Sequence, residues 1–195
     1  MLFLPHLLAR RLRPRDMMIS RMLSGPAFLL DANRVNANGK LRAMNQLEKW
    51  HADGVIRLKF PEHAQSEAEA SGNARRTRKA REYLIPQTYI TTDEEQERLQ
   101  KIERIIFGDA PLSPQDKNDA LNVFNAHKYF GIFVTADGVL VNAADRLRDE
   151  LRAVVVMSDE SAVEQVRKRI HVRDKMARAD AAREGCPLPD WVGKD

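Results

Sequence analysis

The sequence has little cysteine, few aromatic residues and no long apolar run. Cys186 is the only cysteine among 195 residues, which excludes an internal disulfide framework and any zinc site made of several cysteines. Trp50 and Trp191 are not interleaved with cations, as they would be in an aromatic platform for stacking bases. The longest apolar candidate, residues 1–9, contains a proline and is far shorter than the ~20 residues of a membrane span. We therefore expect a cytoplasmic protein that does not cross a membrane.

The composition is that of a globular protein with its own core, because 43% of the residues are hydrophobic and 31% are charged. We predict one domain over 26–171, with a basic N-terminal extension over 1–25 and a charged C-terminal extension over 172–195. In the N-terminal extension the arginines follow the apolar stretch, the reverse of a secretory signal. This order indicates an extension or a later start, at Met17, Met18 or Met22.

Apolar strand-like runs alternate with helical patterns along the predicted domain. We predict strands over 26–31, 55–60, 131–135 and 154–156, and helices that begin near positions 41, 61, 92, 113, 142 and 158. The predicted N-terminal caps are Thr92, in a capping box with Glu95, then Ser113 before Pro114, Asn142 and Ser158. The last helix continues through Ile170. This alternation predicts an α/β fold, a three-layer α/β/α sandwich around a mostly parallel sheet.

Carboxylates follow two of the predicted strands. Asp31 and Asp137 lie at the ends of apolar runs, and the carboxyl ends of parallel strands meet at one edge of a sheet. Asp119, early in the helix before the 131–135 strand, and Glu67, in the helix after the second strand, are placed near the same edge. Acids gathered in a desolvated cleft repel one another unless protons or a divalent cation compensate. Carboxylate oxygens without cysteine or convergent histidine select Mg²⁺ or Mn²⁺.

The order and spacing of these acids resemble the motifs of the PIN-domain nucleases. Residues 28–33, Phe-Leu-Leu-Asp-Ala-Asn, are similar to the first motif of that family, an apolar strand that ends in Asp-x-Asn. Glu67, six residues after Pro61, resembles the acid of the second motif. Residues 119–137 resemble the third and fourth motifs, in which an Asp opens a helix and a strand ends in Thr-x-Asp. The likeness spans residues 26–170, nearly the whole predicted domain.

The resemblance implies a metal-dependent endoribonuclease, a hydrolase of phosphodiester bonds. It implies that one or two Mg²⁺ or Mn²⁺ ions are held by four acids, Asp31, Glu67, Asp119 and Asp137, with Asn33 and Thr135 as polar supports. Glu69 is an alternative for the second acid. Asp116 is either an additional acid at this site or the third-position acid of the Ser113 cap. Many members of the family are toxins of toxin–antitoxin pairs, so the resemblance also implies a possible homodimer and an antitoxin-like protein partner.

A cluster of cations lies outside these motifs. Five of the seven residues over 75–81 are basic: Arg75, Arg76, Arg78, Lys79 and Arg81. Such a run is either a solvated helix face or a contact for the phosphate backbone of RNA.

Two other functions fit part of the pattern. The Asp31-Ala-Asn33 segment also resembles the haloacid-dehalogenase phosphatases, in which the first Asp is the nucleophile and an acid two residues later donates a proton. Asn33 cannot donate that proton. The third reading is a non-catalytic α/β module that binds RNA or a protein through the cations of 75–81.

Overall fold

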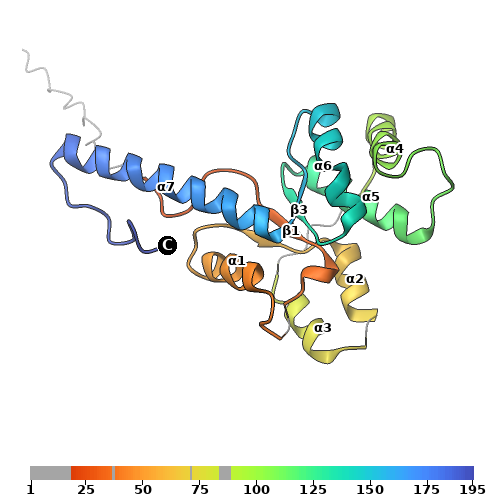
Figure 1. Ribbon diagram of the computed structural model, residues 1–195, viewed down its shortest axis with the longest axis horizontal. Coiled ribbons are helices and arrows are strands. Elements are labelled where there is room, and N and C mark those ends of the chain that lie inside the picture. The colour runs from red at the N-terminus through yellow and green to blue at the C-terminus, as the bar shows by residue number, and fades with distance from the viewer. Residues whose placement is uncertain (1–18, 37, 71, 84–88) are drawn as a thin grey trace, which may run out of the picture.

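Two short apolar strands form the centre of a parallel sheet in the computed structural model, which describes residues 19–36, 38–70, 72–83 and 89–195 (Figure 1). The central strands are β1 (Phe28–Leu30) and β3 (Ile132–Val134), aligned with Phe28 opposite Ile132. The outer strands are β2 (Leu58–Lys59) and β4 (Val156–Met157), and the order is β2-β1-β3-β4 with every pair parallel. The predicted α/β class with a parallel sheet is thereby confirmed.

The predicted strand over 55–60 is wrong in its length. Only residues 58 and 59 pair with β1. Val55 and Ile56 are buried, but the backbone N–H of Val55 donates to the carbonyl of Trp50 and so completes the end of the preceding helix. The β-branched pair therefore fills the core at a turn and does not extend the sheet.

Helices cover both faces of the sheet and make the three layers. The side chains of Phe28 and Leu30 enter one core with α1 (Arg42–Ala52) and α7 (Asp159–Glu184). Leu29 enters the other core, formed by α4 (Asp93–Phe107), α5 (Pro114–Lys128) and α6 (Gly138–Leu151). The period-two alternation of a strand explains this division, since successive side chains point to opposite faces. The shorter elements η2 (Ala32–Arg34), α2 (Glu62–Ala70) and α3 (Ala74–Ala80) contact the first core.

The helix caps confirm some predictions and correct two. Ser113 and Asp116 form a complete capping box at the start of α5, as predicted. Thr92 caps α4, but the Glu95 side chain accepts from the N–H and hydroxyl of Thr91 and does not close a box with Thr92.

The cap of α6 was expected at Asn142 and lies five residues earlier. Asp137 is the N-cap, and its Oδ1 accepts from the backbone N–H groups of Val139 and Leu140 at 2.7 and 3.1 Å. Asp137 and Asn142 are both suitable cap residues. The carboxylate satisfies two of the N–H groups that an uncapped helix would leave open, and Asn142 then falls inside the helix.

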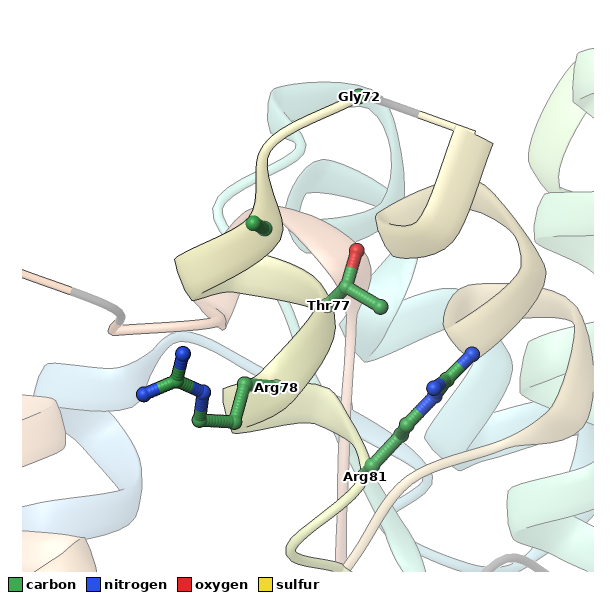
Figure 2. Close-up of a pocket in the computed structure, with 5 residues that line it drawn as sticks. Gly72, Thr77, Arg78 and Arg81 are labelled. Carbon is green, nitrogen blue, oxygen red and sulfur yellow. The ribbon is translucent and has the colours of Figure 1, made fainter.

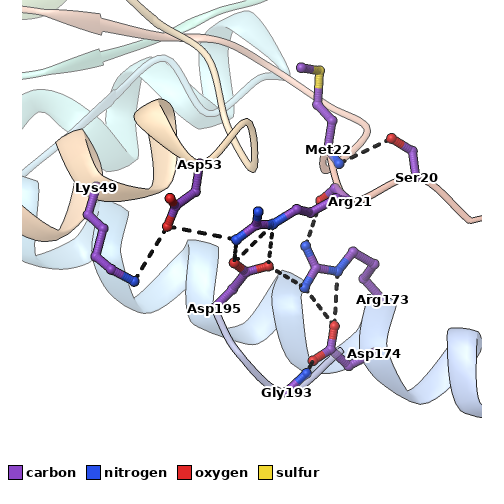
Figure 3. Close-up of polar contacts among 9 residues, drawn as sticks. All are labelled: Ser20, Arg21, Met22, Lys49, Asp53, Arg173, Asp174, Gly193 and Asp195. Atoms are coloured by element: carbon purple, nitrogen blue, oxygen red, sulfur yellow. Dashed lines mark hydrogen bonds and ion pairs between the residues drawn. The ribbon is translucent and has the colours of Figure 1, made fainter. Parts of the chain in front are cut away.

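The predicted C-terminal extension continues the last helix of the domain. α7 runs without a break from Asp159 to Glu184, past the predicted boundary at 172, and the following residues turn back along it (Figure 1). Figure 3 shows what holds them: Arg173 donates to Asp174 at 2.7 Å and to Asp195 at 2.9 Å, and Arg21 donates to Asp195 at 2.5 Å. The Arg173 guanidinium also lies 4.4 Å from the ring centre of Trp191. A polar cluster thus ties the last residues to α7 and to residue 21.

The N-terminal extension is described only from residue 19, so Met17 and Met18 lie outside the described residues. Leu23 belongs to the first core, while Met22 is exposed. In the part of the chain that the structure describes, none of the helices combines the length and apolar composition that crossing a membrane requires.

Gly131 permits the close approach of β1 and β3. A Cβ at this position would collide with Leu29 Cδ1 and lie 3.2 Å from the carbonyl oxygen of Ala27. We expect Gly131→Ala to lower the free energy of unfolding by roughly 1–3 kcal/mol, because overpacking displaces the neighbouring strand. Urea denaturation measures the change. Gly138→Ala is the matched control, since a Cβ there meets nothing within 4 Å, and equal stability of the two variants would contradict the prediction.

Candidate active site

The sheet order places a crevice between β1 and β3. The chain leaves β1 toward β2 on one side and later returns to β3 on the other, so β1 and β3 flank the topological switch point. Ligands of open α/β sheets bind outside the carboxyl ends of strands at this point. Asp31 follows β1 directly, and Thr135 follows β3 directly.

A hydrogen bond joins the two strand ends. Thr135 Oγ1 donates to Asp31 Oδ2 at 2.5 Å, and Asn33 Nδ2 donates to the same oxygen at 2.6 Å. The backbone N–H of Asp137 donates to Thr135 Oγ1 at 2.9 Å. Asp31 is only 5% exposed, and burial raises the pKa of its carboxyl group while the Thr135 hydrogen bond opposes the rise. Thr135 and Asn33 therefore hold Asp31 in one orientation.

Glu67 and Asp119 come from different helices and are bridged by an amide. Gln115, one turn before Asp119 on α5, donates through Nε2 to Asp119 Oδ1 at 3.2 Å and to Glu67 Oε1 of α2 at 3.0 Å. Residues four apart on a helix share a face, and the Ser113 cap sets where that face begins. The bridge brings the carboxylate of α2 to the start of α5.

The four predicted acids act on one another electrostatically. The pKa of Asp119 is raised to about 7, first by burial and then by the negative charges of Asp31, Glu67 and Asp137. Glu67 also raises the pKa of Asp31. We call these four residues the acid quartet. Among the described residues, no lysine, arginine or histidine forms an ion pair with the quartet, so no described side chain neutralises its charge.

The donors of the acid quartet fit a hard divalent cation. All four are carboxylates, the ligands preferred by Mg²⁺ and Mn²⁺, and the polar hydrogens of the Gln115 amide already lie between two of them. Over the described ranges, however, no group of three or more acidic, histidine or cysteine side chains is close enough to hold an ion as it stands. The described side chains therefore do not form a ready-made coordination sphere, and the Gln115 amide lies between Glu67 and Asp119.

Two acids that the sequence left open are engaged elsewhere. Glu69 accepts a hydrogen bond from Arg81 Nε at 2.8 Å. Of the two glutamates, it is therefore Glu67 that lies beside Asp119, through the Gln115 bridge. Asp116 accepts from the backbone N–H and the hydroxyl of Ser113 at 2.8 and 2.7 Å, and these bonds lower its pKa. Asp116 belongs to the helix cap and is not among the charges that raise the pKa of Asp119.

Sequence reasoning missed two amides on α5. Gln115 lies four residues before Asp119, and this spacing alone predicts that the two side chains share one face of the helix. Asn122, three residues after Asp119, is 1% exposed, and neither its Nδ2 nor its Oδ1 has a hydrogen-bond partner in the described part of the chain. Buried polar groups are paired in most proteins, so Asn122 marks a second polar position on the face that carries Asp119 and Gln115.

The predicted RNA-binding cations are not equivalent. Lys79 lies 2.8 Å from Glu82 and 3.6 Å from Glu48, and Arg81 pairs with Glu69. Arg75 and Arg78 are exposed. Figure 2 shows Arg78 and Arg81 leaving α3 in different directions around a pocket of about 440 Å³.

The fifth cation, Arg76, points to the sheet edge instead. Its Nη2 donates to the carbonyl oxygen of Ala32, the residue after Asp31, at 2.7 Å. Most of the cations over 75–81 therefore lie on a solvated or ion-paired surface, and Arg76 alone among them contacts the segment that follows Asp31.

No protein-family model matches this chain, and a comparison with curated proteins finds no significant match.

Metal-free protein should reveal the repulsion within the acid quartet. The pKa of Asp119 is higher in the folded state, about 7, than the ordinary 3.8, so folding stability falls as the pH rises between these values. We expect Asp119→Asn to remove that loss and to be more stable than the wild type at pH 8 by roughly 1–2 kcal/mol, after allowance for solvent screening. Urea denaturation from pH 5 to pH 8 in the presence of a chelator measures the effect.

Asp116→Asn is the matched control on the same helix. Its pKa is lowered by the Ser113 hydrogen bonds, so its ionised form contributes stability above the ordinary pKa, and the variant should be less stable than the wild type at pH 8. Opposite signs for the two variants support the electrostatic description. A loss of stability in both would contradict it.

Proposed function

We propose that this protein is a divalent-metal-dependent endoribonuclease with a PIN-like site that hydrolyses phosphodiester bonds in RNA. The observation that carries the proposal is the gathering of the acid quartet at the carboxyl ends of β1 and β3, where Gln115 bridges Glu67 and Asp119. Burial and the other three carboxylates raise the pKa of Asp119 to about 7. The described residues gather negative charge at this edge of the sheet, and none of their lysine, arginine or histidine side chains forms an ion pair with the acid quartet. A hard divalent cation bound at such a site relieves the repulsion between the carboxylates and so stabilises the fold.

In this proposal Asp31, Glu67, Asp119 and Asp137 hold one or two Mg²⁺ or Mn²⁺ ions. A bound cation of this kind supplies an activated water and stabilises the developing charge on the leaving oxygen. Thr135 and Asn33 fix the Asp31 carboxylate by donating hydrogen bonds to Oδ2. Asp137 uses Oδ1 to cap α6 and has Oδ2 left for a ligand.

The competing functions have less support. A haloacid-dehalogenase-like phosphatase needs an acid at position 33, but the side chain there is an amide, whose N–H is too weakly acidic to protonate a leaving group. The Asn33 amide instead donates a hydrogen bond to Asp31. A non-catalytic module that binds RNA or a protein through α3 has no need for a self-repelling acid quartet, which destabilises the fold. Of the five cations over 75–81, only Arg75 and Arg78 are both exposed and without an ion pair to other described residues.

The proposed nuclease function also implies which partners the protein binds and where in the cell it acts. RNA is the substrate, and the resemblance to PIN nucleases extends to a toxin role with an antitoxin-like partner and a homodimer. A cytoplasmic location agrees with the exposed, unbridged Cys186, because a reducing compartment leaves such a thiol free.

A cleavage assay tests the proposal. A panel of RNA and single-stranded DNA oligonucleotides is incubated with the wild type in Mg²⁺, Mn²⁺ or EDTA, and products are resolved by electrophoresis. We expect RNA cleavage that EDTA abolishes and that Asp119→Asn lowers about a hundredfold or more, because the lost carboxylate holds the cation that stabilises the transition state.

Glu67→Gln and Glu69→Gln form a matched pair on α2. Both changes neutralise one glutamate, but only Glu67 contributes to the acid quartet. The proposal requires Glu67→Gln to lose activity and Glu69→Gln to keep it. Equal cleavage by the wild type and Asp119→Asn, or equal loss in the two α2 variants, would overturn it.

A further inference from the structure

A second pocket adjoins the acid quartet. It has a volume of about 380 Å³ and lies between η2, the segment before α1 and the start of α3. Its wall contains Ala32 and Asn33, the two residues after Asp31, and Asn33 donates to the Asp31 carboxylate at 2.6 Å. We call it the η2 pocket. A ligand seated in it lies next to the acid quartet, along the same stretch of backbone.

The η2 pocket combines an apolar lining with cations. Val35 and Leu41 line it, and both are half-buried against the first core. Arg76 and Lys40 supply positive charge. The Arg76 guanidinium is held in place by its 2.7 Å hydrogen bond to the Ala32 carbonyl. A planar ring with a phosphate attached is complementary to such a lining, because the ring faces need apolar or guanidinium contact and the phosphate needs a cation.

The polar groups of the η2 pocket divide into fixed and open ones. The Asn36 amide donates to Asn45 Oδ1 at 2.6 Å and accepts from the Leu41 N–H at 3.1 Å, so it is committed to the fold. Asn38 and Lys40 are exposed and form no hydrogen bond or ion pair with other described residues. The hydrogen bonds of Asn36 therefore fix the wall of the pocket. At its rim, the Asn38 amide and the Lys40 ammonium group are available to a ligand.

We infer that the η2 pocket binds one unstacked nucleobase of a single-stranded RNA, the base next to the phosphodiester that the acid quartet hydrolyses. The inference rests on the proposed nuclease function. The quartet repels the RNA backbone, so cations close by are needed to bring a phosphate to it, and Lys40 and Arg76 are the ones that line the adjoining pocket. A base in a duplex is stacked and paired and cannot enter without being extruded, so the enzyme acts on single strands.

Binding is measured by fluorescence anisotropy with Asp119→Asn protein in Mg²⁺, which leaves the strand uncut. The probes are a short single-stranded RNA, the same RNA with one abasic site at each position in turn, and its duplex. We expect one abasic position to weaken binding about tenfold, or about 1.4 kcal/mol, and the duplex to bind more weakly than the single strand.

Two substitutions at the rim locate the effect. Asn38→Trp places a large side chain over the pocket and should make the intact and abasic strands bind alike, while Lys40→Ala should weaken both. Lys175→Ala, an exposed cation on α7, is the charge-matched control and should bind RNA as the parent protein does. Equal binding of intact and abasic strands by the parent protein would overturn the inference.

The two proposals can fail separately. RNA cleavage without any abasic-sensitive position leaves the nuclease and overturns the nucleobase pocket. Abasic-sensitive binding that Asn38→Trp removes, without metal-dependent cleavage by the wild type, supports the pocket and overturns the nuclease.

Discussion

The parallel pairing of β1 with β3 is the constraint on which the site depends. Because the two strands run in the same direction, their carboxyl ends open onto one edge, and Asp31 and Thr135 emerge there within hydrogen-bond distance. The close approach requires Gly131, where a side chain would meet β1. The Thr135 hydroxyl then joins Asp31 to the backbone of Asp137. One oxygen atom thus aligns two acids of the quartet.

The acid quartet is electrostatically unfavourable by itself. Burial and mutual repulsion raise the pKa values of Asp31 and Asp119, and the protein offsets this cost with neutral donors: a hydroxyl, the amides of Asn33 and Gln115, and the N–H groups at the start of α6. Neutral donors orient carboxylates without cancelling their charge. The hydrogen bonds to the quartet therefore fix the directions of its carboxylates, while Arg76 and Lys40 line the adjoining η2 pocket.

Much of this arrangement could be predicted from the sequence because its determinants are local. The apolar runs of β1 and β3 end in Asp31 and Thr135, the Ser113-Pro114 pair begins α5, and the parallel-sheet rule brings the strand ends together. The cap of α6 was misplaced because both Asp137 and Asn142 can cap a helix, and the choice depends on where the chain leaves β3. The length of α7 was missed because Arg173 is buried by contacts with Asp195 and Trp191, which are distant in sequence. The Gln115 bridge likewise depends on how α2 packs against α5, which no local pattern encodes.

The central claim is that mutual repulsion among four carboxylates at the β1–β3 switch point makes a cation site. Anomalous diffraction from crystals grown with Mn²⁺ tests it most directly, because manganese is located independently of any activity. The account predicts a manganese peak coordinated by carboxylates of the acid quartet, with the Gln115 amide moved from between Glu67 and Asp119. Density that shows no manganese there, with Gln115 still bridging the two acids, would contradict it.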